Sequence, residues 1–305
     1  MINRLKKHLK EIKIISVVVL AVVTLIIASG ILGFNWLDVF SYAGFYADKS
    51  EGLSVSFIDT GKSDAIFITC DGYNILVDAG EEITGKDVCA YLDRYKTKNI
   101  DLLVATHPDN DHIGGMGKVI DTYNVKELWQ PKLNEKLITK TPSYENMIRA
   151  INEKSVLVKN PQKDYVADFG DLKVTVLSPD REYNNTNDSS IVLMLQYYSK
   201  RFLLMGDIET NAELNLINNY GEKLNADVLK VSHHGSNKGT SNELLQLVSP
   251  EYAVILVGVN INNLPSKGCI ERLENNGCKI LRTDLQATVT VNALKNGKIL
   301  VHTEK

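Results

Sequence analysis

The chain has 305 residues, of which 44% are hydrophobic and 23% are charged, and its formal net charge is −3. This is ordinary globular composition, with enough length for one large α/β domain or two small ones. Residues 1–13 carry five basic side chains and one acidic, a charge of +4, which leaves −7 for the remainder. Broad, non-specific nucleic-acid binding rests on a basic surface and is therefore disfavoured, although bound divalent ions would reverse the sign locally.

Residues 14–37 form an uncharged, mostly apolar stretch directly after the basic end. Its 24 residues exceed the roughly 20 that a helix needs to span a bilayer. A cleaved signal peptide is the alternative, because Ala28, Ser29 and Gly30 are small, but its apolar core is only about 7–15 residues long. A buried core helix is disfavoured because the run is not amphipathic. We expect a retained single-pass anchor in the cell membrane, with the basic end cytoplasmic and the rest of the chain outside.

The four cysteines stand at positions without a CxxC pattern, which makes a structural zinc knot improbable: Cys70, Cys89, Cys269 and Cys278. Outside the membrane both disulfides and free thiols are open, and the sequence does not choose a pairing.

Residues 38–52 are predicted to be a linker, and residues 53–305 one domain. The domain begins with strand-like runs, LSVSFID, AIFITC and YNILVD, followed by a helical pattern over 87–96 and a buried strand over 100–106. After a second β-rich block (LKVTVLS, SIVLMLQYY, RFLLMGD), helices at 210–219, 242–248 and 268–276 alternate with strands at 227–232, 252–258 and 278–284. Two β-rich halves that both carry helices predict an α/β fold in four layers, an αββα sandwich.

The stretch THPDNDHIGG, residues 106–115, places His107, Asp109, Asp111 and His112 within six positions after a buried strand. In an extended strand end, residues 107, 109 and 111 point to one side, and a turn at 111–112 would bring the second ring beside them. Four such ligands can serve two adjacent metal ions. A polar loop with an Asp–His hydrogen bond is the alternative, disfavoured here because buried charges need partners or a metal.

Three further candidates follow predicted strands: Asp78 after YNILV, Asp207 after RFLLMG, and the pair His233 and His234 after DVLKVS. The runs FIDTGKSDAIFI, ILVDAG, ATHPDNDHIGG, NDSSIVL, LLMGD and DVLKVSHHGS occur in this order. Together they resemble the metallo-β-lactamase superfamily, and specifically its ComEC-type branch, the C-terminal domain of a competence DNA-uptake protein. The resemblance covers about residues 52–292.

The resemblance implies a role for each candidate. His107 and Asp109 would hold the first metal ion, Asp111 and His112 the second with one histidine of the 233–234 pair, and Asp207 would bridge the two. Asp78 would orient the ligands through hydrogen bonds. Asn187 and Asp188 fall where the superfamily has another ligand of the first ion, and which of them reaches it is open. The working assignment is Asp188 and His233 as ligands, Asn187 as a supporting residue, and Asp111 and His234 as the catalytic pair.

Two divalent ions about 3.5–4 Å apart are suited to hydrolysis by in-line displacement. Aspartate at 109 makes the first site oxygen-rich and favours manganese or magnesium, whereas the histidine-richer second site favours zinc. We therefore expect two divalent ions, Zn or Mn. The polar residues around the paired histidines have two interpretations, phosphate contacts or plain loop residues: Lys230, Ser232, Ser236 and Lys238.

Three positions depart from the ComEC-type pattern. Asn263-Leu264-Pro265 stands where Gly-His-Pro is usual, Lys62-Ser63 replaces Gln-Gly, and no glycine follows Thr283-Asp284. We expect a membrane-anchored, extracytoplasmic phosphodiesterase or nuclease acting on single-stranded DNA or a teichoic acid that bears phosphocholine. The alternative is a metal-binding sensor without turnover, and β-lactam or thioester hydrolysis is disfavoured.

Overall fold

The computed structural model describes Thr24, residues 52–138 and residues 140–305. The chain divides into two units, residues 1–48 and 49–305, and the description below concerns the second. The predicted anchor and linker lie outside the described residues, apart from Thr24 and Gly52. In the part that is described, no helix has the length and apolar character to cross a membrane.

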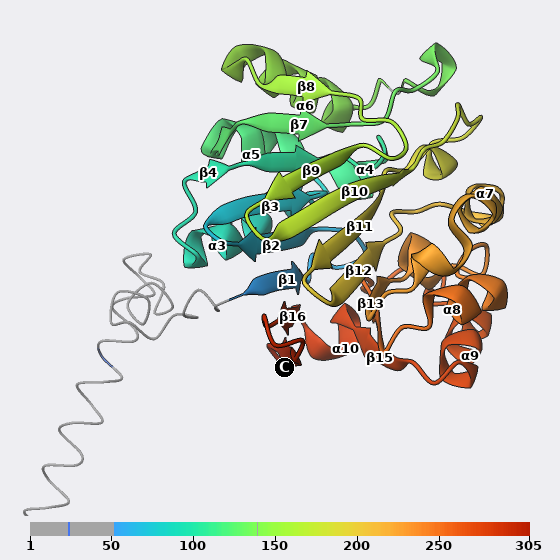
Figure 1. Cartoon of the computed structure of the whole chain (residues 1–305). Coiled ribbons are helices and arrows are strands. Elements are labelled where there is room, and N and C mark those ends of the chain that lie inside the picture. The colour runs from blue at the N-terminus through green and yellow to red at the C-terminus, as the bar shows by residue number, and fades with distance from the viewer. Residues whose placement is uncertain (1–23, 25–51, 139) are drawn as a thin grey trace, which may run out of the picture. The chain divides into compact units, whose positions relative to one another are not determined.

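Two large sheets form the centre of the domain (Figure 1). In spatial order, the first consists of β17 (Ile299–Thr303), β16 (Val289–Ala293), β1 (Leu53–Phe57), β2 (Ile66–Cys70), β3 (Tyr73–Val77), β5 (Leu102–Val104), β7 (Glu127–Trp129) and β8 (Leu157–Lys159). The second consists of β15 (Lys279–Arg282), β14 (Tyr252–Ile255), β13 (Val228–Lys230), β12 (Lys200–Leu204), β11 (Val192–Tyr197), β10 (Leu172–Ser178) and β9 (Val166–Phe169). A small parallel pair joins β4 (Asn99–Ile100) and β6 (Asn124–Val125).

Each large sheet is antiparallel in one half and parallel in the other. Strands β3, β5, β7 and β8 run parallel in the first sheet, and β12 to β15 run parallel in the second. Because the carboxyl ends of parallel strands meet at one edge, the loops that follow these strands gather there.

The helices cover the outer faces of both sheets. On the first sheet lie α3 (Gly85–Arg94), α5 (Met116–Thr122) and α6 (Pro142–Lys154), and on the second α7 (Thr210–Tyr220), α8 (Asn242–Val248) and α9 (Lys267–Asn275). Shorter turns are α4 (Asn110–Ile113), α10 (Thr283–Gln286), η1 (Glu135–Leu137), η2 (Asn187–Ser189), η3 (Gly221–Leu224) and η4 (Ser232–Gly235).

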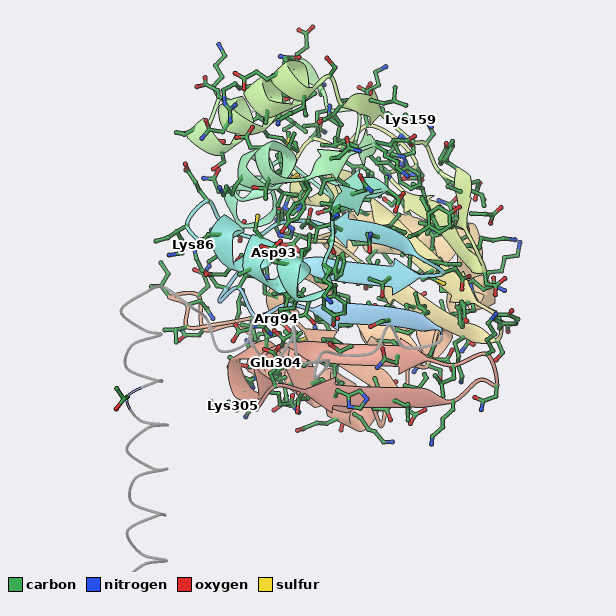
Figure 2. The ribbon with its side chains drawn as sticks, turned by 90° about the vertical axis from the view of Figure 1, so that its left-hand side faces the viewer. Lys86, Asp93, Arg94, Lys159, Glu304 and Lys305 are labelled. Atoms are coloured by element: carbon green, nitrogen blue, oxygen red, sulfur yellow. The ribbon has the colours of Figure 1, made fainter. Side chains whose placement is uncertain are left out.

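Three apolar cores hold the layers together. One lies between the sheets and includes Phe57, Trp129 and Tyr197, and the other two fill the spaces between each sheet and its helices. The predicted four-layer αββα sandwich is confirmed. Arg94 at the end of α3 forms an ion pair with Glu304 after β17, 2.5 Å between Nη1 and Oε1, which ties the helix layer to the sheet edge (Figure 2).

The predicted helices after residue 200 agree with α7, α8 and α9 to within a residue or so. One local prediction is wrong: residues 107–111 are not an extended strand end. Strand β5 ends at Val104, and α4 begins at Asn110 because the amides of His112 and Ile113 both bond to the carbonyl of Asp109, each at 3.0 Å. The four cysteines are free and buried.

Candidate metal centre

The candidate residues lie at the carboxyl ends of four strands. Asp78 follows β3, His107 follows β5, Asp207 follows β12, and His234 follows β13. The first two strands belong to one sheet and the last two to the other. The site therefore lies where the parallel halves of both sheets present their loops.

Two buried imidazoles and two carboxylates form a compact group. Nε2 of His112 lies 3.3 Å from Oδ2 of Asp207, and Nε2 of His234 lies 3.5 Å from the same oxygen and 3.5 Å from Oδ2 of Asp111. Four donors bonded to one ion at about 2.0–2.2 Å in a tetrahedron lie about 3.3–3.6 Å from one another. The three contacts match this spacing. Asp111, His112 and His234 form one candidate metal group, and Asp207 forms another with His107 and His112.

The Nε2 atoms of His112 and His234 are buried and have no hydrogen-bond partner. Buried polar atoms are normally hydrogen-bonded, so two unpartnered imidazole nitrogens facing the same carboxylate need an explanation. A divalent cation between them satisfies both, and the donor set of two nitrogens and two oxygens is one that zinc and manganese accept. The residues present therefore fit a metal ion.

The opposite ring nitrogens are held in place by the protein. Nδ1 of His112 lies 2.7 Å from Oδ2 of Asp78, and Asp78 also accepts hydrogen bonds from the backbone amide (2.9 Å) and hydroxyl (2.7 Å) of Thr106. Nδ1 of His234 lies 2.9 Å from the carbonyl oxygen of Leu256. Such partners fix the tautomer and the orientation of a metal-binding imidazole, so Asp78 has the orienting position expected of it.

His107 lies on the other side of Asp207 in a looser arrangement. Its side chain is buried and forms a candidate metal group with His112 and Asp207. Asp109 lies 3.7 Å away, Oδ2 to Nε2, and its side chain is 38% exposed. Among the residues that the structure describes, this side offers fewer close ligands than the His112 side.

Two predicted ligands, His233 and Asp188, form contacts with other residues of their surroundings. Nε2 of His233 is 4.0 Å from Asp207, its Nδ1 lies 3.3 Å from Glu209, and the ring is outside the candidate groups that include His234. Both oxygens of Asp188 accept hydrogen bonds, one from the amide of Glu209 at 2.8 Å and one from Asn185 at 2.9 Å. The side chain of Asn187 donates to Glu209 at 3.4 Å. The geometry thus differs from the expected assignment by favouring His234 over His233 and by tying Asp188 into its own loop.

Asp64 is a buried charged residue that the sequence pattern did not single out. This residue lies in the turn between β1 and β2, its side chain is 1% exposed, and it forms an ion pair with Lys230. Lys230 is also 1% exposed, lies 3.4 Å from Oδ1 of Asp207, and donates to the carbonyl oxygen of Gly206 at 3.0 Å. The buried ammonium group of Lys230 therefore neutralises the carboxylates of Asp64 and Asp207, and it is not free to contact a substrate phosphate. The signal for Asp64 was a carboxylate two positions before the mostly apolar strand β2, where a charge needs a buried partner.

Neighbouring carboxylates raise the pKa values of two of these histidines, and burial lowers that of the third. Burial lowers the pKa of His234, but Asp207 and Asp64 outweigh it and raise the value to about 10. The pKa of His112 is raised well above its usual value because Asp207 and Asp78 outweigh burial. By contrast, burial and the neighbouring His112 lower the pKa of His107 to about 4. Without a cation the group balances its carboxylates with imidazole protons, which a divalent ion would displace.

The glycines of the motif allow close backbone contact. A Cβ on Gly115 would lie 2.1 Å from the carbonyl oxygen of Ala79, and one on Gly114 would lie 2.4 Å from the amide nitrogen of Glu82. Only glycine fits these positions, so the loop that carries Asp111 and His112 packs directly against the segment after β3.

Two of the departures from the ComEC-type pattern lie beside the site. A Cβ on Gly235, next to His234, would lie 2.5 Å from Cβ of Pro265, and one on Gly258 would lie 2.5 Å from the backbone of Gly61. The remaining polar candidates form local contacts: Ser232 donates to the carbonyl of Ile208, Ser236 accepts from the amide of Lys238, and Lys238 pairs with Glu209.

A sequence model of the metallo-beta-lactamase superfamily matches residues 58–259, about two thirds of the chain, and this span contains every residue of the metal centre. The chain belongs to the metallo-beta-lactamase superfamily. The αββα sandwich is the fold of that superfamily. Membership, together with the candidate metal ligands, supports divalent-metal binding and metal-dependent hydrolysis.

Similar curated proteins place the chain in the ComEC-type branch. ComE operon protein 3 of Bacillus subtilis (strain 168) is 30% identical over 261 residues, covering 79% of this chain and 33% of that protein. Competence protein ComA of Neisseria gonorrhoeae is 28% identical and covers 87% of this chain and 37% of that protein. The chain thus spans about a third of the length of these two relatives. Exodeoxyribonuclease WalJ of Streptococcus pneumoniae serotype 2 (strain D39 / NCTC 7466) is 22% identical, covering 68% of this chain and 81% of that protein.

Proposed function

We propose that the protein is a membrane-anchored, extracytoplasmic dinuclear metallohydrolase that cleaves a phosphodiester, either single-stranded DNA or a cell-surface polymer. The observation that carries the proposal is the pair of buried, unpartnered Nε2 atoms of His112 and His234 arranged around Asp207. Buried polar atoms are normally hydrogen-bonded, and a metal ion between these two nitrogens and the carboxylate would satisfy both.

Each side of the centre has its own ligands in this proposal. His112, His234, Asp111 and Asp207 would hold one ion, and His107, Asp109 and Asp207 would hold the other. His234 replaces His233 as the ligand, and His233, with its side chain 24% exposed, is free to contact substrate. Divalent ions held by these residues would supply Lewis acidity, which lowers the pKa of a bound water towards neutrality and polarises a phosphoryl oxygen.

The protein's own residues arrange the reaction. The side chain of Asp111 is 32% exposed, so its carboxylate faces both the buried group and the solvent and is placed to accept the proton of the attacking water. Asp78 and the carbonyl of Leu256 fix the two imidazoles. Lys230 offsets the negative charge of Asp64 and Asp207, which reduces repulsion of an anionic phosphodiester.

The choice of a phosphodiester is supported by the names of similar proteins and by the donor set. One relative is a competence protein and another an exodeoxyribonuclease. An oxygen-rich site at Asp109 suits manganese, and the histidine-richer group suits zinc. The anchor at 14–37 and the location outside the membrane rest on the sequence pattern.

The test is hydrolysis of bis-p-nitrophenyl phosphate and of single-stranded DNA by the purified chain with added Mn²⁺ or Zn²⁺. The expected result is turnover that requires the metal and falls at least about 100-fold in His107→Ala. Lys267→Ala is the control, because that side chain is 92% exposed on α9. Equal rates in the wild type and His107→Ala, or no turnover of either substrate, would overturn the proposal.

A metal-binding module without turnover is the second candidate, favoured by one observation. Leu264 stands where ComEC-type sequences have a histidine, and its neighbour Pro265 packs against Gly235 beside His234. Bound metal without hydrolysis would support this candidate. Metal-dependent turnover that is lost in Asp207→Ala would eliminate it.

A further inference from the structure

A cavity of about 170 Å³ opens beside His107. Its walls include the loop after β7, α4 and α6, and α6 packs against α4. Clefts that hold drug-sized ligands measure about 300–1,000 Å³. This cavity is smaller, so it has room for one ring system and not for an oligosaccharide.

The walls combine apolar surface with a few polar groups. Ile113, Leu133 and Met147 are apolar, and Tyr144 contributes an aromatic ring that is partly buried against the core of the helix layer. Such a surface suits a flat, uncharged group, because a base can stack on an aromatic side chain whatever its identity.

Several polar atoms at the rim of the cavity have no partner among the described residues. Neither the side-chain amide of Gln130 nor the ammonium group of Lys132 has a hydrogen-bond or ion-pair partner among the described residues. Asn160 donates through Nδ2 to the carbonyl of Gln130 at 3.0 Å, which leaves its Oδ1 as an acceptor. The rim thus offers an amide donor, amide acceptors and one positive charge.

We propose that this cavity binds one nucleobase of a DNA strand whose phosphodiester lies at the metal centre. Tyr144 provides the stacking surface, Gln130 and Asn160 contact the edge of the base, and Lys132 binds the neighbouring phosphate. The inference rests on the proposed phosphodiesterase function and narrows its substrate to DNA.

The same walls are unsuited to phosphocholine, the other phosphodiester group considered above. Recognition of a quaternary ammonium uses a cage of several aromatic rings. The cavity lining has a single tyrosine and no carboxylate, and Lys132 at its rim would repel the cation. The chemistry of the cavity therefore favours a nucleobase over choline.

The experiment compares the Kd of deoxyadenosine 5′-monophosphate with that of deoxyribose 5-phosphate, measured by calorimetry on the Mn²⁺-loaded full chain. Both probes carry the same phosphate monoester, so their ratio isolates the base from any interaction with the metal. We expect the nucleotide to bind about 5- to 150-fold more tightly than the sugar phosphate, the range for stacking of one base. In Tyr144→Ala the ratio should fall towards one, and in Gln130→Ala it should fall severalfold.

Matched variants separate stacking from folding. Tyr144→Phe keeps the ring and should keep the ratio. Tyr198→Ala removes a tyrosine that is 48% exposed in the turn before β12, at the opposite end of that strand from Asp207, and should also keep it. For a single-stranded dinucleotide, Lys132→Ala should reduce the slope of log Kd against log salt by about 0.7, the value for one phosphate contact.

The outcomes also separate this inference from the proposed function. A ratio near one in the wild type, or a ratio unchanged in Tyr144→Ala, would overturn the nucleobase site even if the same preparation hydrolyses bis-p-nitrophenyl phosphate. Choline phosphate binding more tightly than the nucleotide would overturn it in favour of a cell-surface polymer. A retained ratio without hydrolysis of any phosphodiester would leave the base site standing and remove the hydrolase.

Discussion

The two sides of the candidate metal centre differ in how closely their ligand atoms lie and in how firmly other residues hold the ligands in place. On the His112 side, three contacts of 3.3–3.5 Å link the four ligand atoms, and a hydrogen-bond partner fixes the Nδ1 atom of each imidazole. On the His107 side, Asp109 is 38% exposed and lies 3.7 Å from the imidazole.

In the proposed two-ion centre, this difference predicts that the two sides bind metal with unequal affinity. A site whose ligands are already oriented loses less conformational entropy on binding, whereas a site with an exposed carboxylate must order it first. We therefore expect a tight ion on the His112 side and a weaker ion on the His107 side. The second ion would then control activity at a given metal concentration.

The largest effect is expected for Asp207→Ala, because Asp207 belongs to both sides. The variant should lose both ions, and it leaves Lys230 with a buried charge that has lost one of its two carboxylate partners. Breaking a buried charge pair costs about 3–5 kcal/mol. Elemental analysis measures the number of ions per chain, and denaturant unfolding measures the free energy of unfolding. Asp168→Ala, an exposed carboxylate on β9, is the control, and an Asp207→Ala chain with normal metal content would contradict the shared position.

The neighbouring histidines provide a sharper comparison. His234→Ala should weaken the tight ion more than about 100-fold, beyond the 10- to 100-fold cost of removing a residue that only supports a ligand. His233→Ala should leave that affinity within a few-fold of the wild type, because its ring is 4.0 Å from Asp207 and lies outside the group. Metal titration of both variants decides between them, and the reverse order would restore the assignment of His233 as the ligand.

A smaller effect is expected for Asp78→Asn. The change weakens the contact that orients His112 and should lower affinity on that side by about 10- to 100-fold. Affinity on the His107 side should change less, because Nδ1 of His107 reaches Asp78 only through the hydroxyl of Thr106, 3.1 Å away. The same metal titration measures the affinity of each side. An equal loss of affinity on the two sides would show that they bind metal as one cooperative unit.

The pH dependence of metal binding should also differ between the sides. His112 and His234 have raised pKa values, about 10 for His234, so they are protonated at neutral pH without metal and must release protons to bind it. The apparent affinity of the tight side should therefore rise with pH by about tenfold per unit for each proton displaced, and fall on acidification. With a pKa of about 4, His107 is already neutral above about pH 5, so the weak side should show little such dependence. Affinity measured between pH 6 and 8 tests this, and a pH-independent tight phase would contradict it.

The sequence predicted the layers well because their signal is local. Apolar runs and helical spacing are read from neighbouring residues, and the parallel order of strands places their carboxyl ends together. The sequence places His107, Asp111, His112 and Asp207 after predicted strands, and the resemblance to the ComEC-type branch implies that they share one centre.

The remaining features depend on contacts between distant segments. Asp64 and Lys230 are 166 positions apart, and neither looks unusual until the two sheets bring them together. The choice between His233 and His234 depends on the tight turn η4, in which both residues have positive φ values of 46° and 51°. Both oxygens of Asp188 accept hydrogen bonds, from Glu209 and Asn185, and no local pattern indicates these partners.

Titration of the metal-free chain with Zn²⁺, in the wild type and in His107→Ala, tests the central claim most directly. We predict two binding phases in the wild type, of which His107→Ala removes the weaker and keeps the tighter. The absence of binding in the wild type, or the loss of both phases in His107→Ala, would contradict a centre built from one prepared site and one incomplete site around Asp207.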